Sequence, residues 1–198
     1  MPRRRLRSVA LALAATLLAC TGPTLAEVAV GQAAPDFRLK DLDGNEVALA
    51  DLAGKVVVLE WANPNCPFWK RHADQKTMQS TSAKHPEVVW LAVNSTNPSH
   101  GDHLDAAAWK AFLAERGITY RVLADPTGAT GQAYGARTTP HMYVIGADGK
   151  LAYVGAIDDD PRGNGAKVNY VDQALAELAA GKPVTTASTR PYGCSVKY

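Results

Sequence analysis

Cys66 is the side chain best placed to do chemistry. It lies between an apolar, β-rich run at residues 55–60 and a segment that can be helical, and Pro67 follows it directly. Proline suits the first position of a helix, because the N–H that it lacks would have no partner inside the helix. Cys66 is then the N-cap residue, where the helix dipole and unpaired N–H groups favour the nucleophilic thiolate. The pattern predicts a reactive thiol presented between a strand and a helix.

The neighbours of Cys66 bear on an alternative, an inert cysteine in the core. A lone cysteine is commonly buried and behaves as a small hydrophobe. Here the flanking residues are prolines and asparagines, and three bases, Lys70, Arg71 and His72, follow in the first turns of the predicted helix. Their positive potential would lower the pKa of the thiol further. We therefore expect Cys66 to be reactive.

The first residues have the pattern of an export signal. Four arginines among residues 3–7 precede an apolar run at residues 9–19 that is too short to span a bilayer. Small residues before Glu27 suit cleavage, so we expect a signal peptide over residues 1–26 and export to the bacterial periplasm. A rival is a lipobox-like stretch that ends at Cys20 and would make it a lipidated N-terminus. Only in that case do we expect attachment to a membrane.

Removal of this segment changes the charge and the cysteine count. The whole chain has 21 basic and 19 acidic residues, and loss of the four signal arginines leaves 17 basic residues and a net charge of about −2. The excess of basic charge thus belongs to the signal, and nucleic-acid binding is not expected. The mature chain keeps Cys66 and Cys194, and a cysteine pair in an exported protein indicates a disulfide or a working thiol couple.

Alternation and turn signals predict the strands of a domain at residues 27–183. Two pairs of β-rich segments flank the turn signals Asp43-Gly44 and Asp148-Gly149, which indicates two hairpins. Apolar runs at residues 57–61 and 88–93 are typical of strands buried on both faces.

Helical patterns complete the expected domain. They cover residues 102–117, with Asp102 as the cap, and residues 171–178. We expect an α/β fold with a mixed central β-sheet, helices on both faces and an N-terminal β-hairpin. A tail at residues 184–198, rich in turn-forming residues, carries Cys194 beyond the domain.

Short motifs recur along the chain around these elements. They are Ala34-Pro35-Asp36-Phe37, the strand Val57 to Trp61, Asn63-Pro64-Asn65-Cys66-Pro67-Phe68, Asp125-Pro126, Thr138 to Ile145, and Gly193-Cys194-Ser195-Val196-Lys197-Tyr198. In these motifs the chain resembles the thioredoxin-fold redoxins of the alkyl hydroperoxide reductase/thiol-specific antioxidant (peroxiredoxin-like) superfamily, and within it an exported thioredoxin-like group. The likeness covers about residues 31–183 and the end of the chain. It implies a thioredoxin fold, a cis peptide at Thr139-Pro140 beside the thiol, and thiol oxidoreductase or antioxidant activity without a cofactor.

The sequence departs from that family pattern at three positions. Trp69 stands where thioredoxins have the second cysteine of Cys-x-x-Cys, so exchange within that motif is impossible. Asn63 stands where typical peroxiredoxins have a threonine that binds peroxide and thiolate, and an amide can both donate and accept hydrogen bonds. Arg137 is the only counterpart near the expected cis-proline for the arginine of those enzymes. The residues expected to support the thiol are Asn63, Pro67, Trp69, Lys70, Arg137, Thr139 and Pro140.

The expected chemistry begins with attack by the Cys66 thiolate on a disulfide sulfur or a peroxide oxygen, which gives a mixed disulfide or a sulfenic acid. Cys194, which lies 128 positions later, is the expected resolving thiol. The implied partners are a thiol or disulfide protein, or a peroxide, as substrate, and a reductant that resets Cys66.

Three alternatives stay open. The two cysteines could form a plain stabilising disulfide, worth at most about 4–5 kcal/mol by loop entropy. Cys66, Cys194 and His141 could hold copper or zinc. The aromatic residues around Cys66 could instead form the rim of a non-catalytic interaction module.

Overall fold

The computed structural model describes Met1 and residues 28–198. The rest of the expected signal peptide, its cleavage site and Cys20 lie outside the described residues. Within the described part, no helix is long and apolar enough to cross a membrane. All elements of the fold lie between residues 38 and 195.

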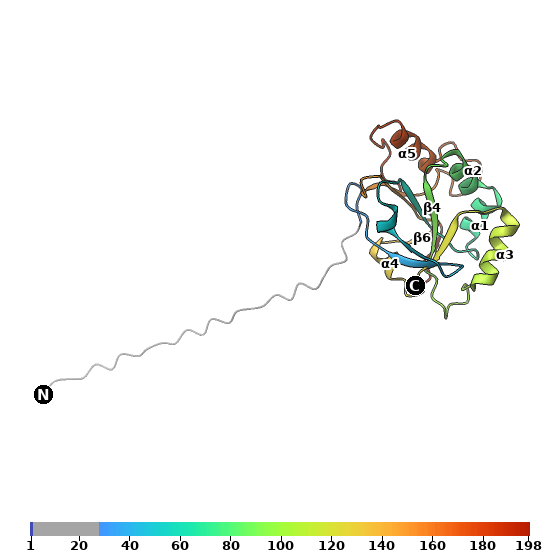
Figure 1. The fold of residues 1–198 in the computed structure, drawn as a ribbon, viewed down its shortest axis with the longest axis horizontal. Helices are drawn as coiled ribbons and strands as arrows, with labels where there is room; N and C mark the ends of the chain where they lie inside the picture. The colour runs from blue at the N-terminus through green and yellow to red at the C-terminus, as the bar shows by residue number, and fades with distance from the viewer. Residues whose placement is uncertain (2–27) are drawn as a thin grey trace.

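A seven-stranded mixed sheet forms the centre of the fold (Figure 1), with the strand order β2-β1-β5-β4-β3-β7-β8. β3, β4 and β5 run parallel to one another, and antiparallel pairs complete both edges of the sheet. The strands are β1 (Arg38–Asp41), β2 (Glu46–Ala48), β3 (Val57–Trp61), β4 (Val89–Asn94), β5 (Arg121–Ala124), β7 (Met142–Ile145) and β8 (Leu151–Gly155).

Both expected hairpins are present. β1 pairs with β2 around Asp43-Gly44, and β7 pairs with β8 around Asp148-Gly149. The two apolar runs predicted as doubly buried strands are β3 and β4, in which nearly every residue is buried. The expected α/β class, with a mixed sheet and an N-terminal hairpin, is confirmed.

Helices cover both faces of the sheet, but unequally. The longer helices pack on the face toward which Val58 and Ala92 point, whereas a 3₁₀ turn and a short helix cover the face of Leu59 and Trp61. This division follows from the alternation of side chains along a strand. Figure 1 shows α1, α2 and α3 on the side of the sheet away from α4. The helices are η1 (Leu49–Leu52), α1 (Pro67–Asp74), α2 (Thr77–Lys84), α3 (Ala106–Arg116), α4 (Ala129–Ala133) and α5 (Tyr170–Ala179).

One helix boundary differs from the expectation, and one helical segment is divided in two. Asp102 is not a cap: α3 begins at Ala106, and Asp105 accepts a hydrogen bond from the Ala108 N–H at 2.8 Å. An N-cap side chain accepts a hydrogen bond from a backbone N–H two or three residues further on, and it is Asp105 that makes this bond. The helix after Cys66 is also interrupted, because Lys76 adopts a left-handed conformation (φ 57°) between α1 and α2.

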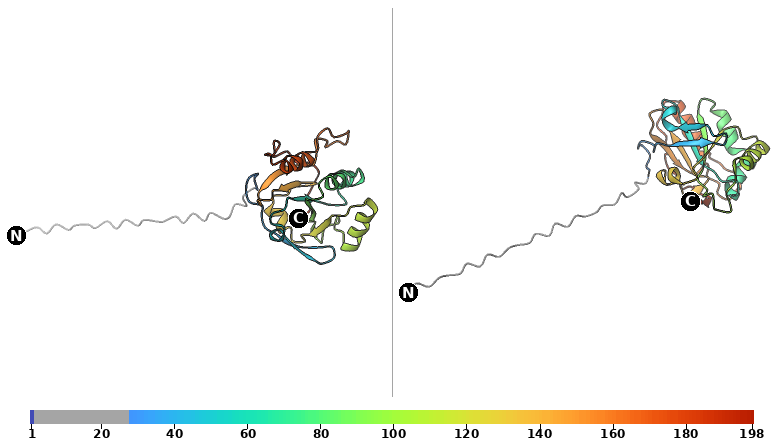
Figure 2. Two further views of the ribbon diagram at one scale, coloured as in Figure 1. Left: turned by 45° about the horizontal axis from the view of Figure 1, so that its top comes forward. Right: turned by 60° about the horizontal axis from the view of Figure 1, so that its bottom comes forward.

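The tail lies against the body of the fold, where the C-terminus is seen in every view (Figures 1 and 2). Its backbone first pairs with β8, since Val154 N–H donates to Ala187 O and Thr189 N–H donates to Val154 O. Further on, β9 (Cys194–Ser195) pairs antiparallel with β6 (Thr138–Thr139) in a second, two-stranded sheet. No sequence pattern predicts either pairing.

Candidate functional site

Cys66 lies at the junction of β3 and α1, as expected. It is the N-cap of α1, with Pro67 at the first helical position, and its backbone is extended (φ −82°, ψ 117°). Its carbonyl accepts the first helical hydrogen bond from Lys70 N–H at 2.9 Å. The residue is only 1% exposed, so its thiol points into the fold and is approached through neighbouring segments.

The loop before Cys66 is shaped by Asn63. Its side-chain oxygen accepts a hydrogen bond from Asn65 N–H at 2.8 Å, and its amide nitrogen donates to Thr96 Oγ1 at 3.4 Å. Asn63 O also accepts from Cys66 N–H at 3.0 Å. Both ends of the carboxamide are therefore committed to the loop, which makes Asn63 a support for the position of Cys66.

The expected cis peptide is confirmed at Thr139-Pro140. The Cys66 thiol donates to the Thr139 carbonyl with a sulfur-to-oxygen distance of 2.8 Å, so this peptide lies directly beside the thiol. The hydroxyl of Thr139 is buried and has no hydrogen-bond partner within the described residues, so it is available to the Cys66 thiolate. Thr139 thus presents a carbonyl and a hydroxyl to the sulfur.

The tail brings Cys194 to the same place. In the register of β6 and β9, Cys194 pairs with Thr139, and Val196 N–H donates to Arg137 O at 3.1 Å. Gly193 has φ 141°, and a Cβ on it would lie 2.1 Å from Thr139 O. Only glycine fits there, because any side chain would collide with the peptide before Pro140.

The two thiols interact, and their ionisation is ordered. Burial acts to raise the pKa of Cys66. Hydrogen bonds from the Cys194 thiol, the Thr139 side chain and the backbone N–H of Trp69 favour the thiolate, so the net pKa is lowered. The Thr139 carbonyl opposes this trend, since it accepts only from the protonated thiol. Burial, the hydrogen bond to Cys66 and the charge of Cys66 raise the pKa of Cys194 to about 11. Cys66 therefore ionises first.

The three bases after Cys66 do not act as expected. Lys70 is exposed, Arg71 donates to Asp160 O at 2.8 Å, and His72 is buried and bonded to Tyr192. The groups that lower the pKa of Cys66 are hydrogen-bond donors at the thiol. Helical periodicity explains the error, because side chains in successive positions leave the helix in different directions.

A hydrogen-bonded chain ties the tail to α1, and the sequence did not indicate it. His72 is 1% exposed, and burial and Arg71 lower its pKa although Asp158 acts to raise it, so the ring is neutral. Tyr192 O–H donates to Asp158 in a short hydrogen bond, and His72 Nε2 lies 2.9 Å from the same hydroxyl. His72 Nε2–H then donates to Tyr192, and Thr77 O–H donates to Nδ1 at 3.3 Å. Tyr192 is two residues before Cys194.

A buried carboxyl group lies beneath α1. Glu60 of β3 is fully buried and accepts from the indole N–H of Trp69 at 2.9 Å, from that of Trp90 at 2.5 Å and from Tyr120 O–H at 3.1 Å. Burial raises its pKa to about 7, against the effect of these three donors. Trp69, which stands where thioredoxins have a second cysteine, thus has a structural role through its hydrogen bond to Glu60. An acid inside an apolar strand was the only signal in the sequence.

The structure does not gather the expected metal ligands. Cys66 and Met142 belong to one core cluster, whereas Tyr143, which contacts His141 Nδ1 at 3.0 Å, belongs to the cluster on the other face. Within residues 28–198, no three His, Cys, Asp or Glu side chains are placed to hold a metal ion. The interpretation that Cys66, Cys194 and His141 form a copper or zinc site is therefore wrong.

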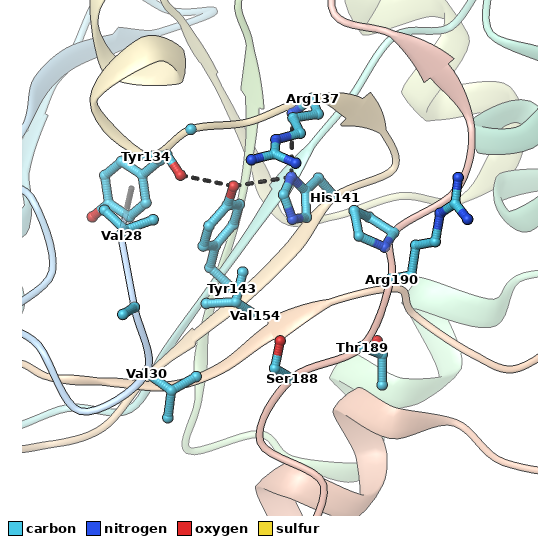
Figure 3. A pocket seen from close by; sticks show the side chains of 13 residues that line it. Val28, Val30, Tyr134, Arg137, His141, Tyr143, Val154, Ser188, Thr189 and Arg190 are labelled. Atoms are coloured by element: carbon cyan, nitrogen blue, oxygen red, sulfur yellow. Dashed lines mark hydrogen bonds between the residues drawn. The ribbon is translucent and has the colours of Figure 1, made fainter. Parts of the chain in front are cut away.

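Arg137 is also directed away from the thiol. Its side chain lines a pocket together with His141 and Tyr143 (Figure 3), while its backbone carbonyl holds the tail. The guanidinium is therefore no counterpart of the peroxiredoxin arginine in this arrangement.

Comparison with known proteins agrees with this geometry. Residues 30–154, more than half of the chain, match the AhpC/TSA family. The chain belongs to this family. A curated relative, the thiol-disulfide oxidoreductase ResA of Geobacillus thermodenitrificans (strain NG80-2), is 32% identical over 63% of this chain and 67% of that protein.

Solved structures extend the likeness to most of the chain. An uncharacterised conserved protein from Geobacillus kaustophilus is 29% identical, with a TM-score of 0.78 over 87% of this chain and 94% of its own. A putative thiol:disulfide interchange protein DsbE from Chlorobium tepidum, 24% identical, shares the fold with a TM-score of 0.55 over 78% of this chain and 98% of its own. The expected thioredoxin-like fold and redoxin superfamily are confirmed.

Proposed function

We propose that this protein is a thiol-disulfide oxidoreductase in which Cys66 is the attacking thiolate and Cys194 the resolving thiol. The observation that carries the proposal is the pairing of β9 with β6, which sets Cys194 opposite Thr139 and within hydrogen-bond reach of Cys66. The name of the ResA relative supports the same reaction class. The couple replaces Cys-x-x-Cys with two cysteines far apart in the sequence.

The reaction has two exchange steps. In the first, the Cys66 thiolate attacks one sulfur of a substrate disulfide, forms a mixed disulfide and releases the other sulfur as a thiolate. In the second, the Cys194 sulfur attacks Cys66, releases the substrate's remaining sulfur as a thiol and passes its own proton to it. The substrate has gained two electrons, and Cys66 and Cys194 share a disulfide that an external dithiol must reduce.

The ordering of the two pKa values suits this sequence. Before the first step, Cys194 stays protonated and donates to the Cys66 thiolate. In the mixed disulfide Cys66 carries no charge and is no longer a thiolate that accepts a hydrogen bond from Cys194. Two of the causes that raise the pKa of Cys194, the hydrogen bond to Cys66 and the charge of Cys66, are then gone. Cys194 then ionises more readily, at the stage when its attack is needed.

A disulfide is favoured over a peroxide as the substrate. The side chains that would bind a peroxide in the related enzymes are used elsewhere: the Asn63 carboxamide holds the loop, and Arg137 lines a pocket on the other face. An extended chain carrying a sulfur, by contrast, already lies beside Pro140 in the form of β9. We place the reaction outside the cytoplasm, on the basis of the export pattern in residues 1–26.

The proposal is tested by trapping the mixed disulfide. All proteins carry Cys20→Ser, are fully reduced, and are mixed with oxidised glutathione before acid quenching and intact mass measurement. We expect Cys194→Ser to accumulate one glutathione on Cys66. Cys66→Ser should gain no glutathione on the time scale of that reaction, and the wild type should pass through the adduct to an internal disulfide.

The same samples exclude the alternatives. If Cys194→Ser gains no glutathione and the wild-type bridge resists mild reductant, the two cysteines form a structural disulfide and the proposal fails. If hydrogen peroxide converts Cys66 to a sulfenic acid much faster than glutathione forms its adduct, the substrate class is peroxide.

A further inference from the structure

The last five residues of the tail, 194–198, lie over Cys66. Cys66 is only 1% exposed, and the Cys194 thiol is within hydrogen-bond reach of its sulfur. β9 occupies the edge of β6 at Thr139, whose carbonyl accepts from the Cys66 thiol. Attack on a disulfide brings a substrate sulfur into contact with the attacking sulfur. The end of the tail therefore fills the space beside Cys66 that a substrate sulfur needs.

Tyr198 fixes the end of this segment in a slot beside α4, formed by Gly128, Gly131 and Ala136. A Cβ on Gly128 would lie 2.6 Å from Cδ1 of the Tyr198 ring, and one on Gly131 would lie 2.6 Å from its hydroxyl oxygen. The hydroxyl donates to Ala136 O at 2.7 Å. Gly131 lies inside α4, where glycine is less favourable than alanine. The absence of a side chain at Gly131 thus makes room for the ring at a cost to the helix.

The other contacts that hold this segment are weak. β9 and β6 pair over only two residues each. Beyond them, Val196 N–H donates to Arg137 O at 3.1 Å, and Lys197 O accepts from Asn97 N–H at 2.6 Å. Tyr198 itself is 42% exposed. Segments with few buried apolar contacts and partly exposed hydrogen bonds open at a lower free energy than the rest of a fold.

Gly193 separates residues 194–198 from a firmly anchored part of the tail. Directly before it, Tyr192 is bonded to Asp158 and His72, which are both buried. Gly193 has φ 141°, and glycine changes its backbone conformation more freely than any other residue. Rotation at Gly193 can therefore lift the last five residues while Tyr192 stays in place.

We infer that residues 194–198 form a strap that opens at Gly193, releases Tyr198 from its slot and so admits the substrate to Cys66. The inference rests on the proposed function, because a disulfide is the substrate that the strap admits. Once the mixed disulfide has formed, the empty slot takes Tyr198 again, and closure returns Cys194 to Cys66. The closed strap thus serves the resolving step, and the open strap serves the first attack.

The test measures access to Cys66 by its rate of alkylation with iodoacetamide. All proteins are full chains with Cys20→Ser and Cys194→Ser, so that Cys66 is the only thiol. Rates are compared at a pH above the pKa of Cys66, where they report access and not ionisation. Tyr198→Ala loses the ring and its hydrogen bond and should react at least about tenfold faster than the parent protein. Tyr198→Phe keeps the ring and should show a smaller rise.

A matched control separates opening of the strap from general loosening of the fold. Leu178→Ala removes a partly buried side chain from α5, which lies at the opposite end of the fold from the C-terminus in Figure 1. This variant should be alkylated at the rate of the parent protein.

Hydrogen exchange gives a second measurement on the same proteins. The Val196 N–H, bonded to Arg137 O, lies in the strap, whereas the Thr189 N–H, bonded to Val154 O, lies in the tail before Gly193. Tyr198→Ala should speed exchange at Val196 and leave exchange at Thr189 unchanged. Equal acceleration at both positions would mean that the tail opens as one piece, and the inference would be wrong.

Two alkylation results also overturn the inference. One is an equal rate for Tyr198→Ala and the parent protein, and the other is a rise of the same size for Leu178→Ala. The proposed function is tested separately, by adding oxidised glutathione to the same proteins. If no protein forms the adduct on Cys66 while alkylation still responds to Tyr198→Ala, the strap is confirmed as the cover of Cys66 and the proposed function fails.

Discussion

At the scale of single residues, the candidate site depends on hydrogen bonds to sulfur and not on nearby cations. The pKa of Cys66 is lowered by Cys194, Thr139 and the Trp69 N–H, although burial opposes them. Exposed charges are screened by solvent and salt, which explains why Lys70 has little influence. In the proposed mechanism Cys194 acts in two ways, as a donor to the thiolate and later as the nucleophile.

Removal of the Cys194 thiol should therefore make Cys66 a weaker acid. We expect Cys194→Ala to raise the pKa of Cys66, because the thiolate loses its strongest donor, and Lys70→Gln to leave it nearly unchanged. The rate of iodoacetamide alkylation of Cys66 against pH measures this, in a Cys20→Ser background. If Lys70→Gln raised the pKa of Cys66 more than Cys194→Ala did, the basic residues of α1 would be the cause of the low pKa.

Glu60 should give the stability of the protein a distinctive pH dependence. Burial raises its pKa from 4.5 to about 7 in the folded state, so folding takes up a proton between these values. Its contribution to stability is complete below pH 4.5 and is lost as the pH rises through 7, by about 3 kcal/mol in all. Urea unfolding between pH 5 and 8 should show this loss, and Glu60→Gln should not.

The difference between the wild type and Glu60→Gln isolates this carboxyl group. His72, whose pKa is lowered, makes stability rise with pH in both proteins and so cancels. Parallel curves for the two proteins would mean that Glu60 is ionised throughout.

At the scale of elements, β9 is held in place from both sides. On one side it pairs with β6, and on the other Tyr192 is bonded to His72 of α1 and to Asp158. Asp158 is 5% exposed and His72 only 1%, so the anchor is shielded from water. The position of Cys194 thus depends on a side-chain network as well as on a strand.

Tyr192→Phe should loosen this anchor without touching either thiol. We expect a loss of about 1–3 kcal/mol of stability, because two buried partners lose their hydrogen bond, and slower attack by Cys194 on the glutathione adduct of Cys66. Formation of the adduct itself, measured with Cys194→Ser, should be unchanged in rate. Tyr170→Phe is the matched control. Equal rates of resolution in Tyr192→Phe and the wild type would show that β6 alone positions Cys194.

The elements also show what the sequence could and could not predict. The hairpins at Asp43-Gly44 and Asp148-Gly149 and the N-cap at Cys66 were predictable, because each depends on residues close together in the chain. The β6–β9 pair was not, since two-residue strands have no periodicity and their partner lies far away in sequence. The chain from His72 to Tyr192 likewise exists only once the tail has docked.

At the scale of the whole molecule, the two faces of the sheet carry different features: Cys66 belongs to the core on one face, and the pocket lined by Tyr143 lies on the other. Adjacent residues after Pro140 point to opposite faces, so Met142 belongs to the core beneath Cys66 while Tyr143 lies beside the pocket. The metal hypothesis failed for this reason, because nearness to Pro140 in the sequence does not decide the face. The tail touches both sides of the molecule, since Tyr192 bonds to His72 of α1 and Tyr198 O–H donates to Ala136 O.

This arrangement predicts how much the Cys66–Cys194 bridge stabilises the fold. Closure of a loop of this length in the unfolded chain contributes at most about 4–5 kcal/mol. Oxidation also removes the hydrogen bonds that the Cys66 thiolate receives from Cys194, Thr139 and the Trp69 N–H, and each is worth roughly 0.5–1.5 kcal/mol. We therefore expect the oxidised protein to be more stable than the reduced one by only about 1–3 kcal/mol at a pH above the pKa of Cys66.

Guanidinium unfolding of the oxidised and the fully reduced chain, both with Cys20→Ser, measures this difference. Cys194→Ala provides the control, because it cannot form the bridge and should respond to reductant with no change in midpoint. A bridge that is only weakly stabilising is easily reduced, as a working couple requires, because the stability that oxidation adds equals the extra free energy needed to reduce the folded protein. A gain of 5 kcal/mol or more would identify Cys66–Cys194 as a structural disulfide and remove the basis for Cys194 as a resolving thiol.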